Sequence, residues 1–117
     1  MTLAAVNITV DTTDPDTLAQ WWATALGGQL NPLAPGFFVI VDLPNGPGLA
    51  FQKVDDPTPG KNRVHLDFGA ADVGAEVERL VGLGATETGR HSMGDFAWVV
   101  LADPDGNAFC VAPADHP

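Results

Sequence analysis

The chain has 117 residues, 15 of them acidic and 5 basic, and a formal net charge of −10. This length predicts one domain, and the acidic surplus argues against binding to nucleic acid or to anionic membranes. A single cysteine cannot form an internal disulfide, so nothing points to an oxidising compartment. The first ten residues lack the features of a signal peptide and no apolar run could span a bilayer, so we expect a soluble cytoplasmic protein.

The first half of the chain has the pattern β-α-β-β-β. Alternating apolar and polar residues predict a strand at 6–10. Asp14 is a good N-cap and Pro15 suits the first helical position, which predicts a helix that runs to about Leu26 and ends at Gly27. Three further strands are expected, near residues 29–30, at 38–41 and at 50–52, the last two joined through a turn at 43–46.

The second half repeats this order. A shift of 58 residues places the first strand on 64–68 and Asp14 on Asp72, which is predicted to open a helix ending near Leu83. A shift of 60 places the buried strand on 98–101 and its turn on 103–106. The shift is then expected to return to 58, with the slip absorbed at 47–48, so that Gln52 corresponds to Cys110.

These matches indicate an internal duplication within a single domain. Chance similarity between amphipathic segments is the alternative, but strand, helix, turn and strand match in the same order. The first module is predicted at 1–54 and the second at 62–117, joined by a linker at 55–61 rich in Asp, Pro and Gly.

The strand around His65 is predicted to be polar on one face. Arg63, His65 and Asp67 share that face, while Val64, Leu66 and Phe68 share the face expected to pack against the helices. In the first strand Asn7, Thr9 and Asp11 are polar in the same way, and Val6 faces the helices. Polar side chains on an inner face require water, one another or a ligand. If a pseudo-twofold axis relates the halves, four repeat-related side chains converge: Asn7 with His65, and Gln52 with Cys110.

The duplication, the Asp at each helix start and the Pro-Asp-Gly turn resemble the vicinal oxygen chelate superfamily. This group includes glyoxalase I, methylmalonyl-CoA epimerase, extradiol dioxygenases, fosfomycin-resistance enzymes and bleomycin-binding proteins. The runs at 61–67 and 101–110 are similar to its actinobacterial glyoxalase-like branch. The resemblance implies an α+β fold in which two β-α-β-β-β modules form a curved, incompletely closed, eight-stranded mixed sheet with helices on its convex side. It also implies a homodimer.

In metal-dependent members of this superfamily, the ligand positions correspond to Asn7, Gln52, His65 and Cys110. His65 matches a family ligand and the epimerases use a Gln at the position of Gln52, but Asn7 replaces the usual His and Cys110 the usual Glu. The set has no carboxylate, which a hard divalent cation prefers, so we predict no functional metal or other cofactor. The alternatives are a divalent ion held through His65 and Gln52, or a softer ion such as zinc on the Cys110 thiolate. Asp67 could orient His65 or contribute one oxygen.

We therefore predict a small-molecule binding protein of the glyoxalase/bleomycin-resistance type. Its ligand is expected to contact six residues: Asn7, Gln52, His65, Asp67, Trp98 and Cys110. The alternative is a lyase or isomerase, glyoxalase- or epimerase-like, that acts on a small metabolite, either with a metal or with His65 as the catalytic base beside Asp67. Inert packing is the favoured interpretation of Cys110, and a nucleophile paired with His65 is the alternative.

A few other residues have two interpretations. Trp98 and its repeat mate Phe38 could form the walls of a binding site or belong to the core. Trp21 is predicted to face outward, which would suit a subunit contact or the flank of the helix. Residues 91–94 are expected to form a loop that covers the site or serves only as a connection. His116 is expected to be a solvated residue of the C-terminal tail.

Overall fold

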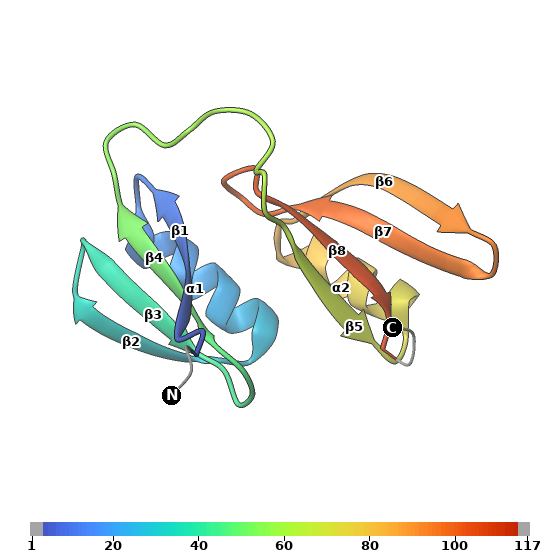
Figure 1. Cartoon of the computed structure of the whole chain (residues 1–117), viewed down its shortest axis with the longest axis horizontal. Helices are drawn as coiled ribbons and strands as arrows, with labels where there is room; N and C mark the ends of the chain where they lie inside the picture. Colours follow the sequence, from blue (N-terminus) through green and yellow to red (C-terminus); the bar gives the residue numbers. More distant parts are fainter. Residues whose placement is uncertain (1–3, 115–117) are drawn as a thin grey trace. The chain divides into compact units, whose positions relative to one another are not determined.

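The computed structural model describes residues 4–114, so His116 lies outside the described part. The chain divides into two compact units between Thr58 and Pro59, inside the predicted linker. The first unit contains one helix and four strands: β1 (Asn7–Thr12), α1 (Pro15–Leu26), β2 (Gln29–Ala34), β3 (Phe38–Asp42) and β4 (Gly48–Lys53). Its strands lie in the order β1-β4-β3-β2, with β1 parallel to β4 and the other pairs antiparallel (Figure 1).

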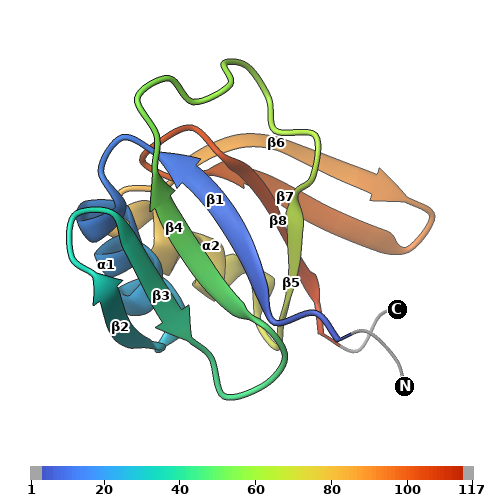
Figure 2. The same ribbon diagram turned by 60° about the vertical axis from the view of Figure 1, so that its left-hand side comes forward.

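The second unit repeats this arrangement. It contains β5 (Leu66–Ala70), α2 (Val73–Leu83), β6 (Thr86–Met93), β7 (Phe96–Ala102) and β8 (Ala108–Pro113). The strand order is β5-β8-β7-β6, and β5 is parallel to β8 (Figure 2). The predicted α+β class and the β-α-β-β-β order of each module are confirmed. The eight strands, predicted in one sheet, are hydrogen-bonded as two sheets of four within the described residues.

Both helices begin and end where their capping residues predict. Asp14 accepts hydrogen bonds from the Thr17 hydroxyl at 2.7 Å and the Thr17 backbone N–H at 3.2 Å, and these bonds lower the pKa of Asp14. Asp72 accepts a bond from the Ala75 N–H at 3.0 Å. At the other ends Gly27 and Gly84 have φ values of 67° and 117°, which glycine adopts without a steric penalty. No helix in residues 4–114 is long and apolar enough to cross a membrane.

Each helix packs on one face of its own sheet and buries a separate core. In the second unit Val77 and Leu80 of α2 are buried, as are the inward residues of the sheet: Val99, Leu101, Phe109 and Val111. Phe68 joins this core through an edge-to-face contact with Phe109, with ring centroids 5.8 Å apart. The α1 core is built in the same way from Leu18, Trp22, Val39, Val41 and Phe51.

Two valines predicted to face the helices are exposed instead. Val6 is 73% exposed and Val64 is 78% exposed. The structural reason is the same for both: β1 begins at Asn7 and β5 at Leu66, so each valine precedes its strand and is not held in the pleat. His65 likewise lies immediately before β5 and not within the predicted strand.

The pairing of the strands also corrects the predicted repeat. Thr9 lies opposite Ala50 in the first unit, and Asp67 lies opposite Cys110 in the second. Thr9 and Asp67 are 58 residues apart, whereas Ala50 and Cys110 are 60 apart. The turns at 43–47 and 103–107 are equal in length, so no slip occurs, and Ala50 rather than Gln52 is the structural counterpart of Cys110.

The predicted loop at residues 91–94 is mostly strand. β6 continues through Met93 because it pairs with β7 along this whole stretch, and the chain reverses at Gly94 and Asp95. The short strand expected near 29–30 is likewise longer than predicted, since β2 is one arm of a hairpin with β3.

Asp103 holds the turn that leads into β8. Its side chain is buried and accepts hydrogen bonds from the backbone N–H groups of Asp105 and Asn107 at 3.0 and 2.8 Å. The Asn107 side-chain amide donates to the same carboxylate. The predicted turn is confirmed by a bond from the Gly106 N–H to the Asp103 carbonyl at 2.9 Å. The carboxylate therefore determines where β8 begins.

We expect Asp103→Ala to destabilise the protein by about 2–3 kcal/mol, because several donors in a partly buried turn lose a charged acceptor. Urea denaturation of the purified variant measures this change. Asp42→Ala, which removes an exposed carboxylate at the end of β3, should change the free energy of unfolding by less than about 0.5 kcal/mol. Equal effects of the two substitutions would contradict the role assigned to Asp103.

Candidate functional site

The sheet of the second unit has one face covered by α2 and an opposite face that carries the predicted site residues. We call this opposite face the site face. It is defined by the row of paired residues that crosses β5, β8 and β7, and by the residues next to that row on the same face. Asp67 of β5 lies opposite Cys110 of β8, which lies opposite Val100 of β7. Two residues along β7, Trp98 shares this face and lies opposite His91 of β6. A polar group and an aromatic side chain therefore lie on the same face.

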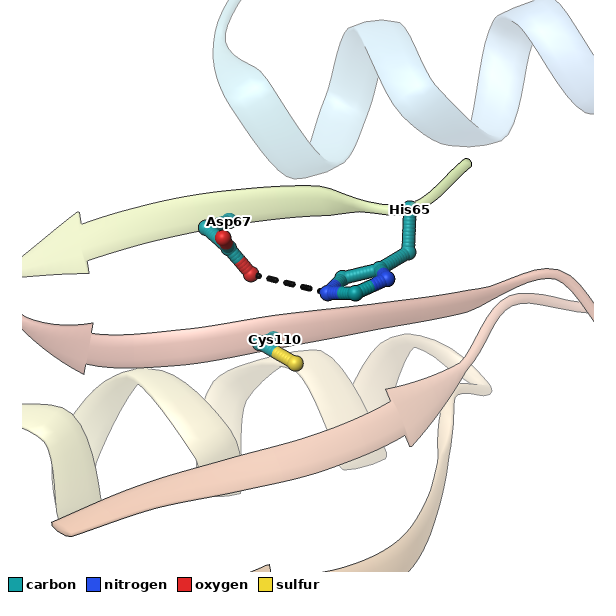
Figure 3. Close-up of side chains that lie close together, drawn as sticks. All are labelled: His65, Asp67 and Cys110. Atoms are coloured by element: carbon teal, nitrogen blue, oxygen red, sulfur yellow. Dashed lines mark ion pairs between the residues drawn. The ribbon is translucent and has the colours of Figure 1, made fainter. Parts of the chain in front are cut away.

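The polar group consists of His65, Asp67 and Cys110 (Figure 3). The Nε2 atom of His65 lies 3.4 Å from Oδ1 of Asp67, and their side chains are 44% and 72% exposed. Cys110 lies next to this pair (Figure 3), and one nitrogen, one oxygen and the sulfur all lie within 4.8 Å of one another. The contact between His65 and Asp67 agrees with the prediction that these two side chains lie on one face, although His65 precedes β5.

Asn62 holds the segment that carries His65. Its side-chain amide donates to the carbonyls of Val64 at 2.7 Å and Ala108 at 3.1 Å, and its side-chain oxygen accepts from the Ala108 N–H at 2.7 Å. Before β5 begins, the Asn62 side chain thus makes the hydrogen bonds to Ala108 of β8 that a paired strand would make with its backbone. Asn62 is a positioning residue that the sequence analysis did not identify. The sequence shows only that an amide side chain comes just before a predicted strand of alternating polar and apolar residues.

The environment of Cys110 favours the neutral thiol. Burial raises the pKa of the Cys110 thiol, and the Asp67 carboxylate raises it further through its negative charge and by accepting a hydrogen bond. Lys61 opposes these effects weakly by its positive charge. A thiol in this state is a poor nucleophile, which agrees with the interpretation of Cys110 as unreactive.

Aromatic rings extend the site face along β7. The Trp98 ring stacks on His91 at 5.5 Å and on Phe96 at 5.6 Å between ring centroids. Trp98 is half-buried, so part of its surface remains available for contact. Trp21, predicted to face outward, is also half-buried and packs edge-to-face against Trp22 at 5.0 Å.

The first unit does not bring Asn7 and Gln52 together. Asn7 lies opposite Gly48, at one end of the β1–β4 pairing, and its side-chain oxygen lies 3.0 Å from where a Cβ atom at residue 48 would be. Gln52 lies opposite Asp11, four residues further along, which is roughly 13 Å in a strand. Both side chains are exposed.

The metal site implied by the family resemblance does not fit these residues. Asn7 and Gln52 are neutral amides held at opposite ends of one strand pair, and the four family positions include no carboxylate. Within residues 4–114 the cluster of three metal-ligating side chains is His65, Asp67 and Cys110. Only two of these occupy family positions.

We expect Asp67→Asn to lower the pKa of the Cys110 thiol, because a neutral amide removes the negative charge that opposes ionisation. The pH dependence of alkylation by iodoacetamide in chelator-treated buffer reports this pKa, since Cys110 is the only cysteine. Its midpoint should move to lower pH in Asp67→Asn and stay in place in Asp95→Asn, which removes another exposed carboxylate of the same unit. An unchanged or higher midpoint in Asp67→Asn would show that Asp67 does not act on the thiol.

A family model for the glyoxalase-like domain matches residues 7–112. A glyoxalase/bleomycin resistance protein/dioxygenase family enzyme from Burkholderia phytofirmans is 18% identical, with 92% of this chain and 96% of that chain covered and a TM-score of 0.79. A superfamily member from Sphaerobacter thermophilus is 22% identical (96% and 98% covered, TM-score 0.73). A lactoylglutathione lyase from Agrobacterium tumefaciens is 18% identical (94% and 92% covered, TM-score 0.70).

At these identities the structures show a shared fold, and no curated protein matches the sequence. The family model spans nearly the whole chain, including both units and every residue of the site face. The protein therefore belongs to the glyoxalase-like domain family.

Proposed function

We propose that the protein binds a small organic molecule on the site face and that the four metal positions of its superfamily are degenerate in this chain. The observation that carries this proposal is the polar group of His65, Asp67 and Cys110 on the same sheet face as Trp98. The superfamily name shared by the similar structures, glyoxalase/bleomycin resistance/dioxygenase, is consistent with a small-molecule ligand.

The chemistry of the site face defines two kinds of contact. Trp98 offers an aromatic surface for a planar or apolar group of the ligand. His65 and Asp67 are exposed enough to exchange hydrogen bonds with a polar group of the same molecule. Asn7 and Gln52 are further ligand contacts in this proposal, supported by the family resemblance and by their exposure.

We also propose that the protein is a cytoplasmic homodimer that does not bind nucleic acid. The net charge of −10 supports the last point, because the phosphate backbone requires a surplus of basic side chains. The family resemblance supports the dimer, and the branch of the family is proposed to be the actinobacterial glyoxalase-like one.

The contact between His65 and Asp67 favours a second candidate function, a lyase or isomerase. With Nε2–H directed at the Asp67 carboxylate, a neutral His65 presents its Nδ1 lone pair as a proton acceptor. The carboxylate would stabilise the imidazolium that forms after proton transfer. Such a base would remove a proton from carbon in a small metabolite.

A thermal-shift screen of small molecules tests the binding proposal, because a ligand that binds only the folded state raises its stability, by about 2.7 kcal/mol at 100 times its Kd. We expect a hit whose affinity falls at least about tenfold, or ~1.4 kcal/mol, in Trp98→Ala and in His65→Ala. Phe37→Ser changes an exposed aromatic residue of the other unit and is the control for surface hydrophobicity. A hit that binds equally well to all three variants would place the ligand elsewhere.

Proton exchange in D2O separates the two candidate functions. If His65 is a catalytic base, a bound hit should lose the NMR signal of a C–H group beside a carbonyl, and His65→Gln should slow this loss by about 10²–10⁴-fold. Binding measured in parallel shows whether the variant still holds the molecule. Exchange that is absent with the wild-type protein, or that continues unchanged in His65→Gln, would contradict the enzymatic alternative.

A further inference from the structure

We propose that Asn45, in the turn between β3 and β4, is a self-modification site that deamidates in the folded protein to a mixture of aspartate and isoaspartate. In isoaspartate the chain continues through the side-chain carbon, so the product has a new carboxylate and a longer backbone. The inference is carried by a comparison of this turn with its counterpart in the second unit. It goes beyond the proposed function and does not depend on it, because the reaction requires no bound ligand.

Two reactive sequence pairs occupy the same place in the repeat. The chain contains one Asn-Gly pair, Asn45–Gly46, and one Asp-Gly pair, Asp105–Gly106. They are 60 residues apart, which is the shift that relates β4 to β8. In both pairs the second residue is glycine, which has no Cβ atom to hinder the approach of its nitrogen to the preceding side chain. The sequence therefore makes both turns candidates for the same ring closure.

The reaction at Asn45 is an intramolecular attack followed by hydrolysis. The Gly46 amide nitrogen loses its proton to hydroxide and forms a bond to Cγ of Asn45. The bond from Cγ to Nδ2 breaks, and Nδ2 takes up a proton from water and leaves as ammonia. The five-membered succinimide then adds one water molecule at either carbonyl, which gives aspartate or isoaspartate. The net change consumes water and releases ammonia, and it requires no oxidant or reductant.

The first turn leaves the attacking nitrogen free. Asn45 and Gly46 are both exposed, and within residues 4–114 the Gly46 N–H makes no hydrogen bond. Gly46 has a φ of 74°, and no atom of a residue beyond its chain neighbours lies within 4 Å of where its Cβ atom would be. Hydroxide can therefore reach the nitrogen, and few contacts oppose a rotation of the backbone toward the Asn45 side chain.

The second turn holds the corresponding nitrogen in place. The Gly106 N–H donates to the Asp103 carbonyl at 2.9 Å, and the Asp105 N–H donates to the Asp103 carboxylate at 3.0 Å. Asn107 donates to the same carboxylate through its backbone N–H and its side chain. Ring closure at Asp105 has to break the bond of Gly106 and strain its neighbours, so the fold protects this pair.

Two differences in sequence explain why the first turn lacks this network. Leu43 lies where the second unit has Asp103, so the acceptor carboxylate is missing. Pro47 lies where the second unit has Asn107, and proline has no N–H to donate. The two turns are equal in length, so the protection depends on these side chains and not on the size of the loop.

The product changes the connection into β4. Asn45 lies three residues before Gly48, whose N–H donates to the Val6 carbonyl at 3.0 Å and which lies opposite Asn7. An isoaspartyl linkage adds a backbone carbon to this connection, and the new carboxylate increases a net charge that is already −10. Modification therefore alters the segment where the pairing of β1 with β4 starts, while the buried core remains as it was.

Peptide mapping by mass spectrometry of the full chain, aged at near-neutral pH, measures both pairs in one sample. For each pair, the rate in guanidinium chloride divided by the rate in buffer gives a protection factor, which cancels the intrinsic difference between Asn and Asp. We expect the factor for Asp105 to exceed that for Asn45 by at least about fivefold, because its turn has hydrogen bonds to break. Equal factors, or an Asn45 that stays intact in the folded protein, would overturn the proposal.

A transplanted turn tests the cause. Leu43→Asp combined with Pro47→Asn gives the first turn the acceptor and donors of the second, and deamidation of Asn45 should slow by at least about fivefold. The matched control, Leu43→Ala combined with Pro47→Asn, lacks the carboxylate and should not slow it. Circular dichroism establishes that both variants are folded. An unchanged rate in the folded Leu43→Asp variant would contradict the role given to the missing carboxylate.

Two further measurements do not depend on the transplanted turn. Isoelectric focusing of the aged protein should show an acidic band that an isoaspartyl methyltransferase labels and that Asn45→Gln lacks, since a glutamine side chain closes the larger ring far more slowly. Asp103→Ala should lower the protection factor of Asp105 toward that of Asn45. Methyl labelling that persists undiminished in Asn45→Gln would place the modification elsewhere and overturn the proposal.

Discussion

The parallel pairing of β5 with β8 is the constraint on which the site depends. Between the end of β5 and the start of β8 lie 37 residues, which include α2 and the β6–β7 hairpin. Side-chain contacts at its start support the pairing. Asp103 determines where β8 leaves its turn, and Asn62 joins the chain before β5 to Ala108. With both in place, Asp67 faces Cys110 and His65 lies beside them.

The parts of the fold that depend on neighbouring residues could be predicted from the sequence. Asp14 and Asp72 cap the helices, and Gly27 and Gly84 end them, because capping requires only side chains within one turn. The extent of β6 could not be predicted in this way. Residues 91–93 are polar or flexible in sequence and become strand because β7 supplies their hydrogen-bond partners.

The error in the repeat has a clear physical origin. A shift of two residues leaves every side chain of a strand on the same face, so the alternation of apolar and polar residues is equally satisfied by shifts of 58 and 60. Similar residue types, Phe51 and Phe109, then favoured the wrong choice. The hydrogen-bonded pairing of the strands distinguishes the two shifts, because it places Ala50 rather than Gln52 at the position that corresponds to Cys110. The site residue Asn62 was missed because its partner Ala108 is 46 residues away.

With the corrected correspondence, the two units have the same strand arrangement but different functional groups at matching positions. The row Asp67–Cys110–Val100 in the second unit corresponds to Thr9–Ala50–Ile40 in the first. Two ionisable side chains in one row are thus matched by a hydroxyl and a methyl group in the other. The cores behind both rows have the same pattern of burial, since β4 and β8 each bury three consecutive residues beginning at Leu49 and Phe109. Substitutions on the face away from the helix can therefore change the chemistry while the packing that forms each sheet is retained.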